Sequence, residues 1–264
     1  MSPPAVRVSR EGDGVVVVTL DRPQQRNALD WQMWEDLDDV YRDLRDDRDS
    51  RVVVLTGEGA CFSAGGDLKS SPARGTGIGA PVARLTAGQR VIIGFSQLPQ
   101  VTVAAVEGFA VGAGWGLALS CDLLVAAEDA FFSAPFLERG LVPDAGIAWF
   151  LTRAIGSRRT ADLLLTGRRL PAPLAEQQGL VSRLVPSQRA LVSALELAAT
   201  VAQGASGAQG LAKRMLRLAD HSSLERFLEV EWLSAALDLH GPEATEGRAS
   251  FAERRPPDFQ QAVR

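Results

Sequence analysis

The sequence predicts an α/β fold over residues 1–187 and an all-helical region over residues 188–264. Short apolar, β-branched runs alternate with amphipathic stretches in the first part of the chain. At two places, within residues 51–68 and 102–122, such a run leads through a glycine-rich turn into a helix. From residue 188 onward only helical periodicity is left, so the boundary between the two regions is placed there.

The first elements follow from residue type and spacing. Residues 15–20 and 52–55 consist almost entirely of valine and leucine, which predicts buried strands. Apolar residues recur at helical spacing over residues 31–46, and Asp30 just before them is a candidate N-cap. The acidic outer face of this helix is expected to be solvated.

The rest of the chain is interpreted in the same way. Residues 70–80 form a glycine-rich loop that either covers a ligand or is a plain surface loop. Strands are predicted at residues 101–106, 123–127, 131–133 and 180–185. Helices are predicted at residues 81–97, 145–155, 157–166, 173–178, 188–203, 207–219, 222–239 and 243–253.

Composition excludes several classes of protein. Of the 264 residues 46% are hydrophobic and 23% charged, as in soluble globular proteins, and a net charge of -4 gives no footprint for nucleic acid. Residues 1–11 lack the apolar core of a secretory signal, and two cysteines make a disulfide framework implausible, so a cytoplasmic protein is expected. Cys61 and Cys121 are interpreted as buried thiols, and with only two histidines no metal centre or Ser-His-Asp site is expected.

The stretch TVAAVEGFAVGAGWGLALSCD, residues 102–122, is where we expect the chemistry. A glycine turn before a helix exposes backbone N–H groups that favour a negative oxygen. Leu117 occupies a position where a dinucleotide-binding fingerprint requires glycine, and the lysine of a P-loop is missing, so neither nucleotide-binding motif is present. Glu107 and Asp122 interrupt the apolar run, so no membrane span is expected. Glycines used only for close helix–strand packing are the alternative interpretation.

The stretch RVVVLTGEGACFSAGGDL, residues 51–68, repeats this arrangement with Gly65 and Gly66 at a predicted helix start. Two backbone N–H donors that converge on one oxygen form an oxyanion hole. The motifs CFSAGGDL, AAVEGFAVGAGWGLALSCD, GLVPDAG, LLLTGRRL and AEQQGLVSRLVP resemble, in order and spacing, the enoyl-CoA hydratase/isomerase (crotonase) family. The resemblance extends from residue 15 to about residue 259.

This resemblance implies a crotonase-type spiral of ββα units, with a C-terminal helical region that makes trimers or hexamers. It implies an acyl-CoA thioester as substrate, with no metal and no further cofactor. The oxyanion donors would be the N–H groups of Gly66 and Ala113. The other substrate-binding positions that it implies are Gln25, Arg26, Ala64, Asp67, Leu68, Lys69 and Phe136.

Departures from the family pattern bear on the reaction. The two glutamates of the family's hydratases correspond to Gly116 and Phe136, neither of which can transfer a proton. Asp144 in GLVPDAG remains; its position suits a helix N-cap, but family members with aspartate here use it as base or nucleophile. Glu138 and Glu107 are competing acids, and Asp122 is interpreted as structural.

One carboxylate suffices for an isomerase. The sequence therefore predicts an enzyme that stabilises a thioester enolate and moves a double bond, or isomerises a ring, with Asp144 as proton shuttle. Hydration, hydrolysis or bond cleavage by the same fold are alternatives, and a non-catalytic acyl-CoA-binding protein is the alternative outside this class. An aromatic acyl pocket is expected from Phe109, Trp115, Phe136 and Trp149.

Overall fold

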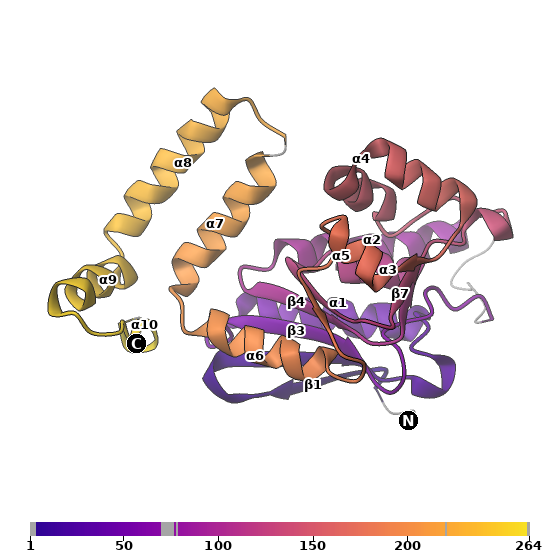
Figure 1. The fold of residues 1–264 in the computed structure, drawn as a ribbon, viewed down its shortest axis with the longest axis horizontal. Helices are drawn as coiled ribbons and strands as arrows, with labels where there is room; N and C mark the ends of the chain where they lie inside the picture. Colours follow the sequence, from indigo (N-terminus) through magenta and orange to yellow (C-terminus); the bar gives the residue numbers. More distant parts are fainter. Residues whose placement is uncertain (1–3, 70–76, 78, 220, 263–264) are drawn as a thin grey trace.

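A six-stranded sheet forms the centre of the fold in a computed structural model that describes residues 4–69, 77, 79–219 and 221–262 (Figure 1). Its strand order is β1-β2-β3-β4-β6-β9, antiparallel between β1 and β2 and parallel elsewhere. The strands are β1 (Val6–Arg10), β2 (Val15–Leu20), β3 (Val52–Gly57), β4 (Val101–Val106), β6 (Leu123–Ala127) and β9 (Arg183–Val185).

A second, three-stranded sheet of order β5-β7-β8 stands beside it. Its strands are β5 (Phe109–Val111), β7 (Phe131–Ser133) and β8 (Leu170–Pro171). The helices are α1 (Trp31–Asp46), α2 (Gly79–Gln97), α3 (Ala113–Leu119), α4 (Ile147–Thr166), α5 (Ala172–Gln177), α6 (Ala190–Ala202), α7 (Ser206–Ala219), α8 (Leu224–Leu239), α9 (Pro242–Glu253) and α10 (Phe259–Ala262).

The inner strands β2, β3, β4 and β6 of the central sheet are buried on both faces, which explains their unbroken apolar runs. Val16 and Val53 point to the core cluster that includes Trp34 and Phe95 of α1 and α2. Val17 and its neighbours on the other face pack against α6. Helix α6 therefore completes the core of the sheet, although it begins after the predicted boundary between the two regions at residue 187. That boundary stays a prediction.

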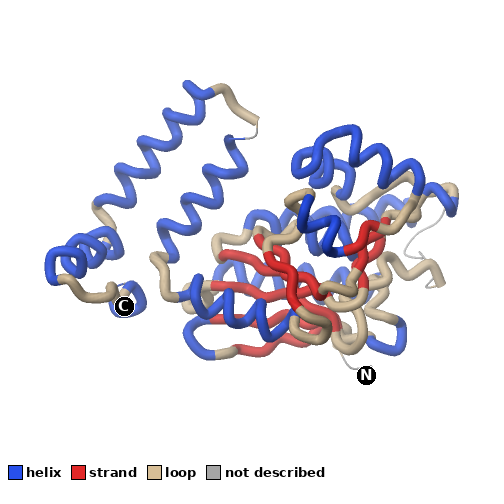
Figure 2. Tube along the Cα trace, viewed as in Figure 1, coloured by secondary structure: helices blue, strands red, loops and turns tan. Residues whose placement is uncertain are grey.

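The structure confirms the first and last residues of several predicted helices and strands. Helix α1 covers residues 31–46, and the Asp30 side chain accepts a hydrogen bond from the backbone N–H of Met33, at 2.9 Å. The strands predicted at residues 15–20, 101–106, 123–127 and 131–133 have those bounds in the structure. The α/β class and the helical C-terminal region are also confirmed (Figure 2).

The helix break predicted at residue 156 is confirmed within α4, because Gly156 has a non-helical backbone with φ at +79°; the first segment begins at Ile147 rather than at residue 145. Other predictions were wrong in detail. The predicted glycine turn after β4 contains a further short strand, β5. Most of the predicted loop 70–80 lies outside the described residues, and Gly79 already belongs to α2.

Helices α7 to α10 project away from the sheet (Figure 1). Their large apolar side chains are mostly exposed, so they do not pack on a core of their own; Trp232 is 61% and Phe251 87% exposed. The others are Leu216, Leu224, Leu228, Leu233, Leu237 and Leu239. None of the described helices has the length and apolar character that a membrane span requires.

Helix α7 is anchored to the sheet by a buried lysine. The Lys213 ammonium lies 2.5 Å from an Asp122 carboxylate oxygen and donates a hydrogen bond to the carbonyl of Gln100, at 2.9 Å. Asp122 also accepts hydrogen bonds from the backbone N–H and hydroxyl of Thr102. Burial lowers the pKa of Lys213, and the Asp122 carboxylate opposes this shift.

Replacing Lys213 with methionine is expected to lower the free energy of unfolding by about 2 kcal/mol, because it removes the buried cation that pairs with the partly exposed Asp122 carboxylate and leaves the Gln100 carbonyl without this donor. Urea denaturation followed by circular dichroism measures this change. The matched control is Arg226→Met, which breaks an exposed ion pair with Glu229 on α8 and should cost no more than about 1 kcal/mol. Equal losses for both variants would contradict the anchoring role of Lys213.

Candidate active site

The turn after β3 is bound to the start of the second sheet. Ser63 donates its backbone N–H to the Phe109 carbonyl, at 3.2 Å, and accepts from the N–H of Val111, at 3.0 Å. Gly65 follows with φ at +88°, and a Cβ there would lie 2.5 Å from the Val111 carbonyl oxygen. Only glycine fits this approach of two backbones.

A buried asparagine holds the same turn from the other side. Asn27 is fully buried, and its side-chain amide donates to the carbonyls of Glu58 and Cys61, both at 2.9 Å. The Ser63 hydroxyl in turn donates to the Asn27 carbonyl, at 2.8 Å. Leu29 donates its backbone N–H to the Gly65 carbonyl, at 2.8 Å. Asn27 is therefore a structural residue of the turn.

The second glycine turn ends where α3 begins. Gly112 is the N-cap, with φ at +51°, and its N–H donates to the Ser133 carbonyl, at 2.8 Å. A Cβ on Gly65 would lie 3.5 Å from the backbone nitrogen of Ala113, so the two turns are in contact. No described residue accepts a hydrogen bond from the N–H of Gly66 or Ala113. Both groups are available to a ligand oxygen.

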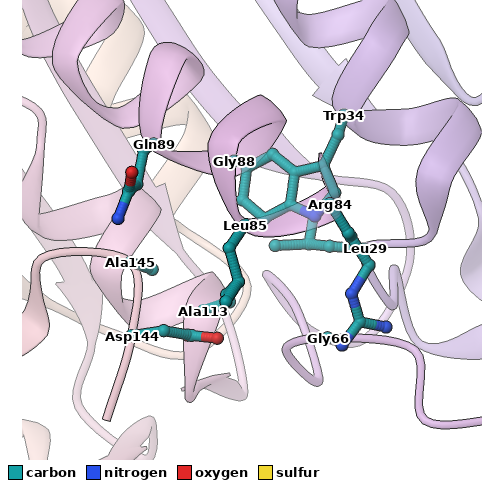
Figure 3. A pocket seen from close by; sticks show the side chains of 10 residues that line it. All are labelled: Leu29, Trp34, Gly66, Arg84, Leu85, Gly88, Gln89, Ala113, Asp144 and Ala145. Atoms are coloured by element: carbon teal, nitrogen blue, oxygen red, sulfur yellow. The ribbon is translucent and has the colours of Figure 1, made fainter. Parts of the chain in front are cut away.

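A small pocket, open to solvent, lies at this junction (Figure 3). It brings Gly66, Ala113 and Asp144 together from three separate segments of the chain, as the sequence predicts for its catalytic residues. The ten lining residues are Leu29, Trp34, Gly66, Arg84, Leu85, Gly88, Gln89, Ala113, Asp144 and Ala145.

Asp144 has an environment suited to a proton-transferring group. Its Oδ1 is buried and has no hydrogen-bond partner within the described part of the chain. Burial raises the pKa of Asp144, while the nearby Arg84 cation opposes this rise. A half-desolvated carboxyl group with an unused oxygen, facing a pocket, is a typical candidate for general acid–base chemistry.

The alternative role of Asp144 as a helix N-cap was wrong. Ala145 and Gly146 both have positive φ angles, +52° and +70°, so the chain enters α4 only at Ile147. Gly146 is the N-cap, and no side chain caps this helix. The Asp144 carbonyl, rather than its carboxylate, accepts a hydrogen bond from the N–H of Ile147, at 3.2 Å.

The same loop explains why one of the two hydratase glutamates is missing, at Gly116. A Cβ on Gly116 would lie 2.4 Å from the Ala145 carbonyl oxygen, so the loop that carries Asp144 fills the space of a side chain there. Phe136 is buried, and its ring lies 3.5 Å from the position of a Cβ on Gly112. Phe136 is outside the pocket lining, so the structure does not bring this predicted substrate-binding residue to the pocket.

The competing acids lie elsewhere. Glu107 accepts hydrogen bonds from the backbone N–H groups of Gln188 and Ala190, at 3.1 and 2.7 Å, at the start of α6. Glu138 is exposed and lies against Gly167, outside the lining. Asp122 is bound to Lys213, as its structural interpretation predicts.

The predicted coenzyme A residues share a surface beside Gly66. The N–H of Ala64 donates to the Arg26 carbonyl, at 2.9 Å, which places the loop of Gln25 and Arg26 next to it. The N–H of Lys69 donates to Asp67, at 2.9 Å, which fixes the local turn. Gln25, Arg26, Leu68 and Lys69 are exposed. Their binding role stays a prediction.

The expected aromatic acyl pocket was wrong. Trp115 is buried in the core and stacks on Phe132, with ring centroids 5.5 Å apart. Phe109 packs on Phe131, and Trp149 is half exposed. The aromatic residue of the pocket is instead Trp34 of α1.

Sequence reasoning also missed the contribution of α2. This helix supplies four of the lining residues, whereas the sequence predicted only a helix at residues 81–97 and no site residue on it. Residues at positions i, i+1, i+4 and i+5 lie on one side of a helix. If one of the four lining residues had been known, this spacing would have indicated the other three. The four residues are Arg84, Leu85, Gly88 and Gln89.

Comparison with known proteins agrees with this geometry. The family model described as enoyl-CoA hydratase/isomerase matches residues 10–262. A "probable enoyl-CoA hydratase" of Mycobacterium bovis is 36% identical over 252 residues, covering 93% of this chain and 94% of that protein. A carnitinyl-CoA dehydratase of Citrobacter koseri is 35% identical over 258 residues, covering 92% and 94%.

Solved structures agree as well. The crystal structure of an enoyl-CoA hydratase from Polaromonas has a TM-score of 0.91 at 32% identity, covering 96% of this chain and 98% of that one. The fold is therefore the crotonase fold that the sequence motifs predict. Given the family-model match over nearly the whole length, the chain belongs to the enoyl-CoA hydratase/isomerase family.

Proposed function

We propose that this protein is an enoyl-CoA isomerase in which Asp144 is the single proton shuttle. The observation that carries the proposal is the buried, unpartnered Oδ1 of Asp144 in a pocket that Gly66 and Ala113 also line. The thioester carbonyl of the substrate is placed against the two backbone N–H groups. The α-carbon then faces the carboxylate.

The reaction is a proton shift within the substrate. Ionised Asp144 takes a proton from the α-carbon of a 3-enoyl thioester, and the electron pair moves onto the thioester oxygen. The N–H groups of Gly66 and Ala113 stabilise this enolate oxygen, as donors in an oxyanion hole do. Protonated Asp144 returns the proton to the γ-carbon, which moves the double bond into conjugation. No atom is gained or lost.

Enoyl-CoA hydratase is the second candidate, because relatives carry that name. Addition of water requires one group to activate water and one to protonate the α-carbon. Among the ten described residues that line the pocket, Asp144 is the single carboxylate. This favours isomerisation over hydration. A hydrolase or lyase of the family, or a non-catalytic acyl-CoA-binding protein, would share the same oxyanion turns.

A paired assay on the purified protein tests the proposal. One arm follows conversion of 3-hexenoyl-CoA to 2-hexenoyl-CoA, and the other follows hydration of crotonyl-CoA. Isomerisation without comparable hydration is the expected result. Hydration faster than isomerisation would reject the proposal in favour of the second candidate. Turnover in neither arm, together with tight ester binding, would favour the binding protein.

The pH dependence of isomerisation should report the perturbed carboxyl group. The base must be ionised, and burial raises the pKa of Asp144, so kcat/KM is expected to fall below a pH that lies above the ordinary range of aspartate. Arg84 opposes the shift; replacing it with methionine should therefore move this acid limb to higher pH. Profiles of kcat/KM against pH for the wild type and for Arg84→Met measure the position of the acid limb in each protein. An unchanged limb in the variant would contradict the electrostatic contact.

We also infer that the coenzyme A part of the substrate lies along the surface of residues 25–26 and 64–69. The reaction then needs no cofactor besides the substrate itself. The exposed apolar residues of α7 to α10 support a homotrimer or homohexamer, because large apolar patches are rarely left in water. We also propose that the protein is cytoplasmic. Analytical ultracentrifugation tests the oligomeric state.

A further inference from the structure

The pocket contains a second charged side chain that the proposed reaction does not use. Arg84 of α2 is half-buried, and it and Asp144 are the charged members of the ten lining residues. Figure 3 shows its guanidinium near Gly66, across the pocket from the Asp144 carboxylate.

Arg84 makes no hydrogen bond or ion pair with any residue that the structure describes. Other arginines of this region are engaged. Arg90, six residues further along α2, lies 3.5 Å from Asp38, and Arg217 donates to the Ser96 carbonyl, at 2.7 Å. A guanidinium stays charged at every physiological pH, so a partly desolvated one without an acceptor favours an anionic ligand.

The planar guanidinium and the apolar lining of the pocket indicate which kind of anion fits. A carboxylate is the geometric complement of a guanidinium, since it accepts two parallel hydrogen bonds. Leu29, Trp34 and Leu85 supply apolar lining for methylene groups between two polar ends of a ligand.

We propose that Arg84 is a specificity-determining residue that selects acyl-CoA thioesters whose acyl chain ends in a second carboxylate. The substrates would be monothioesters of dicarboxylic acids. This inference rests on the proposed function for the position of the thioester at Gly66 and Ala113. The phosphates of coenzyme A are the other source of negative charge, and the experiment separates the two.

Binding of two unreactive esters tests the proposal. Hexanoyl-CoA and adipoyl-CoA differ only in a terminal methyl group against a terminal carboxylate. Isothermal titration calorimetry is expected to show adipoyl-CoA binding about 10- to 100-fold more tightly to the wild type, as for hydrogen bonds to charged groups. In Arg84→Met this preference should disappear while hexanoyl-CoA affinity stays the same. Arg84→Lys should restore part of it.

The matched control is Arg90→Met, which removes a cation from the same helix but outside the pocket and should keep the preference. Equal affinity of the wild type for both esters would overturn the proposal. So would a loss in Arg84→Met that is equal for hexanoyl-CoA, adipoyl-CoA and free coenzyme A, because it would assign Arg84 to the phosphates. These binding measurements need no turnover, so they can be interpreted even if the isomerase assay shows no activity.

Discussion

Replacing Asp144 with asparagine is expected to lower the kcat of isomerisation by about 10²–10⁴-fold, the range typical of a lost general base. Asparagine has nearly the same shape but cannot take a proton from the α-carbon. The affinity for a saturated acyl-CoA should change little, because the oxyanion donors are backbone groups of Gly66 and Ala113. Stopped assays with 3-hexenoyl-CoA and calorimetry with hexanoyl-CoA measure the two quantities.

Glu138→Gln is the matched control. It removes a carboxylate of the same loop region that is exposed and outside the pocket, so the rate should be unchanged. A full rate in Asp144→Asn would rule out the single-carboxylate mechanism. A fall in Glu138→Gln comparable to that in Asp144→Asn would show that the loop, rather than one carboxyl group, limits the reaction.

The stability of Asp144→Asn provides an independent check. Burial raises the pKa of Asp144 in the folded protein above its unfolded value, so the carboxyl group favours folding below the unfolded pKa and loses this contribution as pH rises through the folded pKa. Above the folded pKa the ionised side chain is a cost. The asparagine variant should therefore be at least as stable as the wild type at about pH 8. Thermal unfolding at several pH values measures this difference.

The parts of the fold that adjacent residues encode were predictable from the sequence. Helix α1 needs only the apolar spacing after Asp30 and the cap that Asp30 supplies, and both are local. The valine runs of β2 and β4 likewise specify buried strands. The oxyanion pair required more, since Gly66 and Ala113 were identified through the resemblance to a family and only their glycine-rich turns by local pattern.

The parts that depend on tertiary packing were not predictable in this way. Which face of α2 meets the pocket depends on how it lies across α1, so neither Arg84 nor Trp34 was singled out. Spacing favours Asp144 as a helix cap, and only the left-handed conformations of Ala145 and Gly146 rule this out. Ala145 is strained in that conformation, as residues at functional sites often are.

The second large effect is expected from Gly65→Ala, which should lower kcat by about 10²–10³-fold, the cost of losing one oxyanion donor. The new Cβ would lie 2.5 Å from the Val111 carbonyl oxygen, and the backbone has φ at +88°. One of the two turns must move, which separates the N–H groups of Gly66 and Ala113. Steady-state kinetics with 3-hexenoyl-CoA measures the loss.

A lower rate could also arise from backbone strain alone, and Gly140→Ala separates the two causes. Gly140 has a similar φ, +67°, but a Cβ there meets nothing within 4 Å, and the residue is outside the pocket. Gly140→Ala should lose about 1–2 kcal/mol of stability from the left-handed conformation alone. Gly65→Ala should lose more, because its Cβ also meets the Val111 carbonyl, and only Gly65→Ala should lose the rate. If Gly65→Ala folds and keeps the wild-type kcat, the spacing of the two N–H donors does not limit catalysis, and the enolate must be stabilised by another group of the pocket.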